Sequence, residues 1–498
     1  MSDKNLSDSE FEELLSVSIG DAPPESVIND VTPWKRAMSR VVAGLALCTI
    51  TLNFLGLNYI LPAIGVVLML LGFRSLRREN GWFMTCYVIS IIRTATVFVS
   101  LILNTVTTAR VEISSPRVDE ILTVSVLILN FVLFFCLWRG ILAVQRRSSE
   151  AEPKAKGAGA LMVWYVIMCL LALWQYQGII IMVLMLISYI FIIRSLIKTY
   201  NTLNETGYMI AAAPVKLSGK WICLGIAAVT IVGCICGYVF FSSYDMDWSE
   251  VDPNEHSTLE ETKQQLLTLG FPEDVLNDLT AEDIAACEGA VQVVVDKSSK
   301  QFGLIDESED EFYNKNRLTI TGIGVQLSNE RETWMIFHHF RWTGQTTFYG
   351  TESLQIWTTA RDVSEGWTET GYLSGRVLYD DGKSYAAPFH FLGKQSFSQD
   401  TMFWGTQEST DIFAAFSMPN GVRARRGYVA YEVAELEDGH IISSWINYTH
   451  QLSWFQYPAK TAMEARISSP WSGKNGAFST VQDALQFYPN NGDIEMIS

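Results

Sequence analysis

A single arginine, Arg93, lies in the middle of a long apolar segment, within the sequence Ser90-Ile-Ile-Arg93-Thr-Ala-Thr. A guanidinium in a bilayer costs at least about 2.5 kcal/mol on insertion scales, so such a residue faces a bundle interior or a water-filled cavity. Arg93 could therefore contact an anion or a substrate, or it could make a structural hydrogen bond to Asn53 or Asn130. No Asp or Glu lies well inside an apolar segment, which weighs against proton- or sodium-coupled transport.

Tryptophan is abundant after residue 244, and exposed indole rings can stack on sugars or peptides. Most of these rings are expected in the core, because a domain without disulfides depends on large apolar side chains. Trp367, Trp404 and Trp471 fall on expected loops or strand edges. They are the candidate ligand-binding aromatics.

Sequence patterns for catalysis and metal binding are weak. The adjacent His338 and His339 would point to opposite faces of a strand, and no H-x-x-x-H spacing is present. The acidic runs Asp245–Glu255 and Asp306–Glu311 lack the glycine and terminal glutamate of an EF-hand loop. No G-x-S-x-G, P-loop or dinucleotide-binding motif occurs. We predict no cofactor, no metal and no catalytic residue, and whether the chain is an enzyme stays open.

The formal charge of −17 is divided unevenly. From Tyr244 onward the chain carries 38 acidic and 17 basic residues. This balance argues against a nucleic-acid partner, which requires clustered positive charge. Of the eight cysteines only Cys287 lies in this half, so it cannot contain an internal disulfide, which suits a bacterial surface domain better than an animal ectodomain.

The preceding half contains long apolar segments, which we compare with the roughly 17–25 residues needed to cross a bilayer. They are Val41–Leu55, Tyr59–Phe73, Phe83–Val106, Ile121–Ala143, Ala160–Gln175, Gly178–Ile197 and Trp221–Ser242. We predict an acidic N-terminal tail at 1–40 and a seven-helix transmembrane domain at 41–243. The first two segments are short and could instead form a re-entrant hairpin, which would leave five crossings.

Basic residues indicate the orientation of these segments. Lys and Arg cluster before the first segment and after the second, fourth and sixth, whereas the alternate connections carry few or none. Because cytoplasmic loops are enriched in Lys and Arg, this pattern places the N-terminus in the cytoplasm. An odd number of crossings then places the C-terminal half outside. We therefore predict a multi-pass protein of the cell membrane, with the lipid bilayer as a partner.

The last apolar segment contains Gly233-Cys-Ile-Cys-Gly237. Small residues four apart allow two helix backbones to approach closely. This spacing could support a homo-oligomer through the last helix. Packing against another helix of the same bundle is the favoured interpretation.

The C-terminal half divides into an acidic stalk at 244–256, a small helical module at 257–305 and a β-sandwich domain at 312–498. In the module, Gly270 can end a first helix and Pro272 can begin a second. Thr280 and Asp283 have the spacing of a capping box for a third. The module is too small to be an enzyme by itself.

Alternating apolar residues from Arg317 onward predict an all-β domain with a sandwich or jelly-roll-like fold. The expected strands are Leu318–Leu327, Thr333–Trp342, Ser353–Thr359, Tyr372–Tyr379, Ser384–Leu392, Asp411–Ser417, Arg426–Leu436 and Ile441–His450. Turn signals separate them at Asp380-Asp381-Gly382, Asn420-Gly421 and Asp438-Gly439. The tail Ser479–Tyr488 is expected to form a short closing helix.

Two stretches carry a resemblance. Pro23–Arg36, with Leu52-Asn-Phe and Tyr59–Gly65, resembles uncharacterised multipass membrane proteins of anaerobic Firmicutes. Leu269–Ile284 is similar to a small helical repeat of surface proteins in the same bacteria. The resemblance implies a bacterial source and this architecture, and it carries over no functional residue.

Three functional hypotheses remain open. The first is a binding or sensing module, in which the outer domains recognise a glycan, a peptide or a surface protein. The second is a transporter or a transporter accessory subunit, with Arg93 lining the path. The third is a surface-exposed hydrolase acting through the sandwich.

Overall fold

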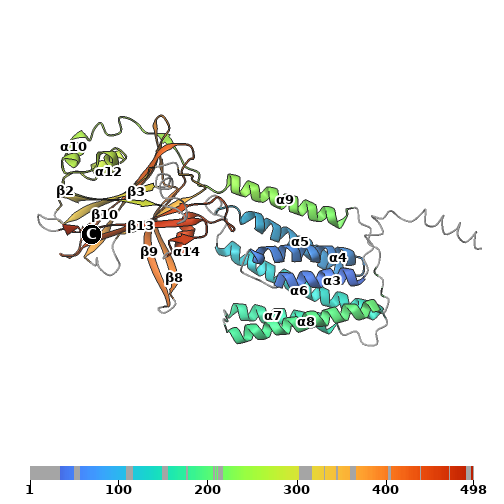
Figure 1. The fold of residues 1–498 in the computed structure, drawn as a ribbon. Helices are drawn as coiled ribbons and strands as arrows, with labels where there is room; N and C mark the ends of the chain where they lie inside the picture. The colour runs from blue at the N-terminus through green and yellow to red at the C-terminus, as the bar shows by residue number, and fades with distance from the viewer. Residues whose placement is uncertain are drawn as a thin grey trace, which may run out of the picture. The chain divides into compact units, whose positions relative to one another are not determined.

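The computed structural model describes residues 34–49, 56–107, 116–148, 155–174, 176, 178–205, 208, 210, 217–301, 317–329, 331–343, 346–358, 366–401, 405–437, 439–469, 472–489 and 495–496. The chain forms two compact units. The helical unit comprises Met1–Leu103 and Ile113–Ile235, and the β unit comprises Asn104–Glu112 and Cys236–Ser498. Figure 1 shows the long helices of the first and the sheets of the second.

The long helices follow the apolar segments of the sequence. They are α3 (Trp34–Thr49), α4 (Leu57–Leu76), α5 (Gly81–Leu103), α6 (Pro116–Arg147), α7 (Lys156–Leu173), α8 (Ile179–Glu205) and α9 (Gly219–Phe240). Six of them, α4 to α9, are long and apolar enough to cross a membrane, among the residues that the structure describes. The chain thus has the features of a multi-pass membrane protein with a β-rich domain.

The first apolar segment differs from its prediction. Its helix, α3, begins at Trp34 rather than Val41 and has 16 residues, fewer than the roughly 17 that a span needs. Exposed Lys35 and Arg36 occupy its first turn, which shortens the apolar part further. Residues 50–55 lie outside the described residues. The predicted seven spans are therefore six in the described chain.

Glycines allow α3 and α4 to pack closely. A Cβ atom at Gly44 would lie 2.5 Å from the carbonyl oxygen of Gly65, and one at Gly72 would lie 2.6 Å from Val41 Cγ2. Both distances are far inside normal van der Waals contact. The two helices can therefore approach this closely only because these positions lack side chains.

The β unit contains two antiparallel sheets. The first has the strand order β1 (Ser249–Glu250), β7 (Ser384–Pro388), β6 (Trp367–Asp380), β10 (Arg423–Glu435), β4 (Thr333–Thr343), β3 (Arg317–Leu327) and β2 (Ala290–Gln301). The second has β12 (Lys474–Asn475), β13 (Phe478–Tyr488), β11 (Ile442–Gln451), β5 (Glu352–Trp357), β9 (Gly405–Phe416) and β8 (Phe391–Thr401), with β14 (Glu495–Met496) paired to β13.

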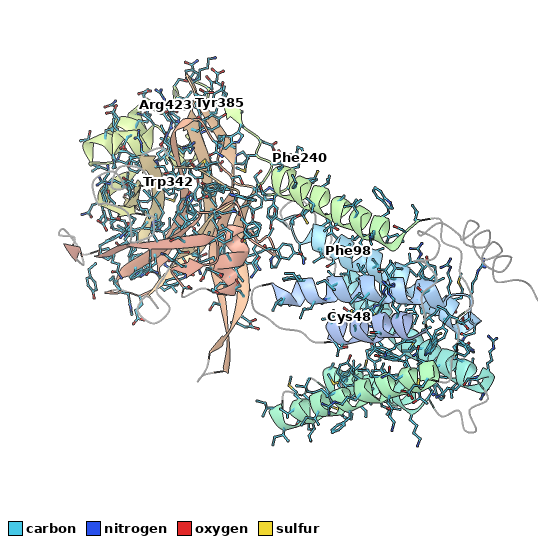
Figure 2. The ribbon with its side chains drawn as sticks, turned by 45° about the vertical axis from the view of Figure 1, so that its right-hand side comes forward. Cys48, Phe98, Phe240, Trp342, Tyr385 and Arg423 are labelled. Carbon is cyan, nitrogen blue, oxygen red and sulfur yellow. The ribbon has the colours of Figure 1, made fainter. Side chains whose placement is uncertain are left out.

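The two sheets enclose one apolar core. Phe340 of the first sheet packs edge-on against Tyr448 of the second, with ring centroids 5.1 Å apart. The buried indole of Trp342, labelled in Figure 2, donates its N–H to the Tyr448 hydroxyl over 3.1 Å. This face-to-face packing is that of a β-sandwich. Each of the eight predicted strands overlaps an observed one, but Ser384–Leu392 covers all of β7 and the start of β8, which lie in different sheets.

The predicted closing helix at Ser479–Tyr488 is wrong. These residues form β13, which pairs along its length with β11. Leu485 and Phe487, two positions apart, are fully buried in the sandwich core. A period of two therefore governs this segment, and the cross-strand partner outweighs its local helical pattern.

Two boundaries of the β unit also differ from those expected. Strand β1 pairs with β7 inside the stretch predicted as a stalk. Strand β2 begins at Ala290, inside the range predicted for the helical module, and pairs with β3. The sandwich therefore extends beyond the predicted range 312–498. It includes β2 and also β1, which lies within the predicted stalk.

Three short helices cover the outer face of the first sheet: α10 (Glu260–Thr268), α11 (Glu273–Leu276) and α12 (Ala281–Ala285). Gly270 follows α10 with φ +93°, and the Thr280 side chain accepts a hydrogen bond from the Asp283 N–H, as the sequence predicts. Buried Leu266, Leu279 and Ile284 share one apolar cluster with Ile323 and Phe337 of the sheet. The module is consequently a layer of the β unit and has no separate core.

Candidate functional site

The predicted site residue Arg93 lies on α5 and is half-buried in the helical unit. The residue lies near Cys48 of α3 and Tyr165 of α7. No hydrogen bond or ion pair joins the guanidinium to another described residue. The expected bond to Asn130 is not formed, and the buried Asn130 Oδ1 has no partner among the described residues. Asn53 lies outside them, so a ligand at Arg93 stays a prediction.

Of the three candidate tryptophans, only Trp367 lies among the described residues. Trp367 is only 5% exposed, packs in the sandwich core and donates its indole N–H to the His440 carbonyl over 3.1 Å. Its ring is therefore a core element in this structure. Trp404 and Trp471 lie outside the described residues. The most exposed tryptophan of the described β unit is Trp454, which sequence reasoning passed over.

The glycine pair in α9 faces its own chain. A Cβ atom at Gly233 would lie 2.7 Å from Ile102 Cδ1, and one at Gly237 would overlap the Thr105 hydroxyl. Both contacts favour packing within one molecule. A homo-oligomer through this helix stays a prediction.

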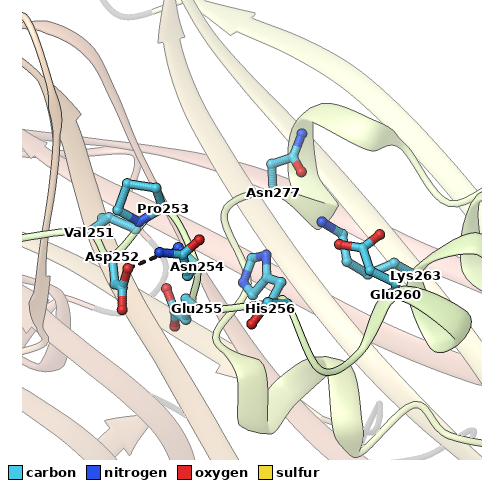
Figure 3. A pocket seen from close by; sticks show the side chains of 10 residues that line it. Val251, Asp252, Pro253, Asn254, Glu255, His256, Glu260, Lys263 and Asn277 are labelled. Atoms are coloured by element: carbon cyan, nitrogen blue, oxygen red, sulfur yellow. Dashed lines mark hydrogen bonds between the residues drawn. The ribbon is translucent and has the colours of Figure 1, made fainter.

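A polar hollow of about 350 Å³ lies where the chain passes from β1 to α10 (Figure 3). Residues 251–257 form one wall, and Glu260, Lys263 and Asn277 form the other. The sequence suggested only a solvated acidic stalk here. No local signal could have identified the hollow, because Asn277 reaches it only after the helical module has folded onto the sheet.

Arg376 of β6 fixes the floor of this hollow. One guanidinium nitrogen donates to both carboxylate oxygens of Glu255 at 3.0 and 3.1 Å, and another donates to the Leu279 carbonyl at 2.9 Å. His256 Nε2 lies 2.8 Å from that same carbonyl oxygen, so it carries the proton and donates. Glu255 and His256 are therefore held in place.

A buried ionic network continues behind Asn277. The Asp278 carboxylate accepts a hydrogen bond from Arg426 Nε at 2.7 Å and lies 3.0 Å from His339 Nε2. Burial raises the pKa of Asp278, but the combined effect of His339 and Arg426 lowers it by more. The pKa of Asp278 therefore lies below its usual value. The carboxylate thus remains ionised and anchors the loop that carries Asn277.

The open side of the hollow offers hydrogen-bonding groups. The side chains of Asn254, Glu260, Lys263 and Asn277 have no hydrogen-bond partner among the described residues, whereas Asp252 accepts from the Asn254 N–H at 2.9 Å. Two amides, carboxylates and one ammonium can bind hydroxyl, carbonyl or amine groups. The arrangement suits a polar ligand.

Two histidines lie beside potential catalytic partners but inside the core. His338 Nε2 is 2.6 Å from Ser444 Oγ, and His450 Nδ1 is 2.9 Å from both oxygens of Glu352. All four residues are at most 2% exposed, so a substrate could not reach them. Among the described residues no group of three or more His, Cys, Asp or Glu could hold a metal ion.

The comparisons with known proteins assign no family. No protein-family model matches the chain, and no curated protein matches it. One solved structure, titled "Pore forming protein", covers 40% of this chain and 94% of its own at 7% sequence identity and a TM-score of 0.16. A likeness at this level carries no argument about fold or function.

Proposed function

We propose that this protein is a binding or sensing module anchored in the cell membrane, whose β unit lies outside the cytoplasm and binds a polar ligand in the hollow. The observation that carries the proposal is that hydrogen bonds from Arg376 fix the floor of the hollow. Arg376 holds Glu255 through two contacts, while the side chains of Asn254, Glu260, Lys263 and Asn277 remain open to a ligand. Such convergent polar groups fix the orientation of bound ligands.

The chemistry of the walls favours a hydroxyl-rich ligand, such as a glycan of the cell surface. Amide and carboxylate side chains can donate to and accept from neighbouring hydroxyl groups. None of the lining residues is Phe, Tyr or Trp, so recognition would depend mainly on hydrogen bonds and not on ring stacking. A peptide ligand would instead use the excess of carboxylates, with a lysine or arginine beside Glu260.

The test uses the full-length protein in detergent against an array of glycans, peptidoglycan fragments and basic peptides. Asn277→Ala and Glu260→Ala should each weaken binding of the selected ligand roughly tenfold, since a hydrogen bond in a site contributes about 1–1.5 kcal/mol. Glu408→Ala, at an exposed position on β9, is the matched control and should bind like the wild type. No binding by the wild type, or equal binding by all variants, contradicts the proposal.

A second candidate function is transport through the helical unit, favoured by the absence of a hydrogen-bonded partner for Arg93 among the described residues. In proteoliposomes, Arg93→Leu should abolish anion flux without reducing the amount of protein in the membrane. Arg194→Leu, at an exposed arginine of α8, is the control. Unchanged flux in Arg93→Leu removes this candidate. A surface hydrolase remains a further hypothesis without an accessible catalytic pair in the described residues.

A further inference from the structure

Two adjacent aromatic side chains project from the loop that joins β11 to α14 (Ala462–Ser468). Trp454 is 60% exposed and Phe455 is 61% exposed. They are the most exposed aromatic side chains among the described residues after α9. Adjacent exposed rings on a domain rich in acidic residues mark an interaction surface.

This loop contacts the end of α9. Residues from Cys236 onward belong to the same compact unit as the loop. The ring of Tyr238 lies 6.1 Å from that of Trp454 and 6.2 Å from that of Phe455, between centroids. The Tyr238 hydroxyl also donates a hydrogen bond to the Gln456 carbonyl. Phe240, the last residue of α9, is labelled in Figure 2.

The loop also contacts the residue that follows α5, which lies in the β unit as well. The Ala459 N–H donates to the Asn104 carbonyl over 2.7 Å, and Asn104 Nδ2 lies 3.5 Å from the Tyr457 hydroxyl. Both α5 and α9 are membrane-capable helices. The loop is therefore attached where two such helices end, and the ends of helices that cross a bilayer lie at the level of the lipid headgroups.

We propose that residues 453–458 form a membrane-interface anchor in which Trp454 and Phe455 insert into the headgroup region of the bilayer. Trp and Tyr at the ends of membrane spans favour this region, because their rings are apolar and their N–H and O–H groups reach water. A second protein is the poorer occupant. Two rings bury at most about 500 Å², well below the roughly 1,200 Å² of a stable protein interface.

The test introduces the photoreactive residue p-benzoylphenylalanine at single positions of the full-length protein, reconstituted in vesicles of phosphatidylglycerol and phosphatidylcholine. The replacement at Phe455 keeps an aromatic side chain at an exposed position, so folding should be preserved. The matched control carries the same residue in place of Leu436, which is 54% exposed in the loop between β10 and β11 and whose N–H donates to the Gly366 carbonyl rather than to a residue at the end of a span. After illumination, mass spectrometry measures lipid adducts on each variant.

We expect a lipid adduct yield at position 455 several-fold above that at position 436. Equal yields overturn the proposal, because they would mean that an exposed side chain of this unit meets lipid only by chance. Adducts at 455 that join two protein chains in place of lipid also overturn it. The inference does not depend on the ligand hollow, so failure of either leaves the other standing.

Discussion

The imidazole of His338 sits between the two sheets at 1% exposure, with Ser444 Oγ 2.6 Å from its Nε2 and no partner for its Nδ1 among the described residues. Burial lowers the pKa of His338 to about 4, although the more distant charge of Asp483 opposes this shift. The folded protein therefore keeps this ring neutral. The unfolded chain binds a proton near pH 6.5.

We predict that acid destabilises the β unit through this histidine. Since the folded pKa is depressed, the stability that the neutral ring supports is present above pH 6.5 and is lost as the pH falls toward 4. The free energy of unfolding should drop by about 2 kcal/mol between pH 7 and pH 5. Thermal unfolding of the full-length protein, followed by tryptophan fluorescence across this range, measures the drop. His338→Gln should flatten the pH dependence, whereas His390→Gln, at an exposed histidine, should not.

Asp278 provides a second residue-scale prediction. Asp278 is 3% exposed, and its carboxylate pairs with Arg426 and His339. Asp278→Asn therefore removes the buried partner of Arg426 and leaves it only the more exposed Asp380. We expect a loss of about 3 kcal/mol in the free energy of unfolding. Asp274→Asn is the matched control, because its pair with Arg341 spans 3.5 Å between half-exposed side chains and should contribute under about 1 kcal/mol. Similar losses in the two variants would show that the network does not anchor the module.

At the scale of elements, the contact between α3 and α4 depends on missing side chains. We predict that Gly44→Leu separates the two helices, since even a Cβ atom would lie 2.5 Å from the Gly65 backbone. The melting temperature of the detergent-solubilised protein should fall by several degrees. Gly225→Leu on α9, where no described atom lies within 4 Å of an added Cβ, is the control and should melt like the wild type. A stable Gly44→Leu protein would mean that the contact is not tight.

Three of the turns between strands were predicted from Asp-Gly and Asn-Gly pairs in the sequence. Gly382, Gly421 and Gly439 all have positive φ, as the turn signals required. Only the turn at Gly382 joins hydrogen-bonded neighbours, β6 and β7. The turns at Gly421 and Gly439 carry the chain from one sheet to the other. Local sequence therefore indicated that the chain turns, whereas the choice of sheet depended on which apolar faces could pack together.

At the scale of the whole molecule, the number of crossings determines where the ends lie. The prediction of seven places them on opposite sides, whereas the six membrane-capable helices described here would place them on the same side unless α3 also crosses. We predict that the first apolar segment, which continues in the sequence beyond the 16 residues of α3, crosses as a seventh span, with the β unit outside. The motivation is the alternation of basic residues along the sequence.

The test uses two separate fusions expressed in bacteria. One carries at its N-terminus a fluorescent protein that matures only in the cytoplasm, and the other carries at its C-terminus alkaline phosphatase, which folds only outside. Fluorescence together with phosphatase activity is the expected result. Fluorescence without phosphatase activity would place both ends in the cytoplasm and reduce the count to six. Moving each reporter to the other end provides the control.

The sequence by itself determined the features that depend on local composition and period. Apolar length predicted the six spans from Tyr59 onward, and alternation predicted the eight strands, because burial of a face imposes a period on the residues that line it. Only the tertiary structure decided features that need partners distant in sequence. Strand β13 exists because β11 offers its edge, Trp367 is buried because the second sheet covers it, and the hollow exists because Asn277 is brought beside residues 251–257. Arg93 combines both cases, since its apolar surroundings are evident from the sequence, while the lack of a hydrogen bond to Asn130 was evident only from the fold.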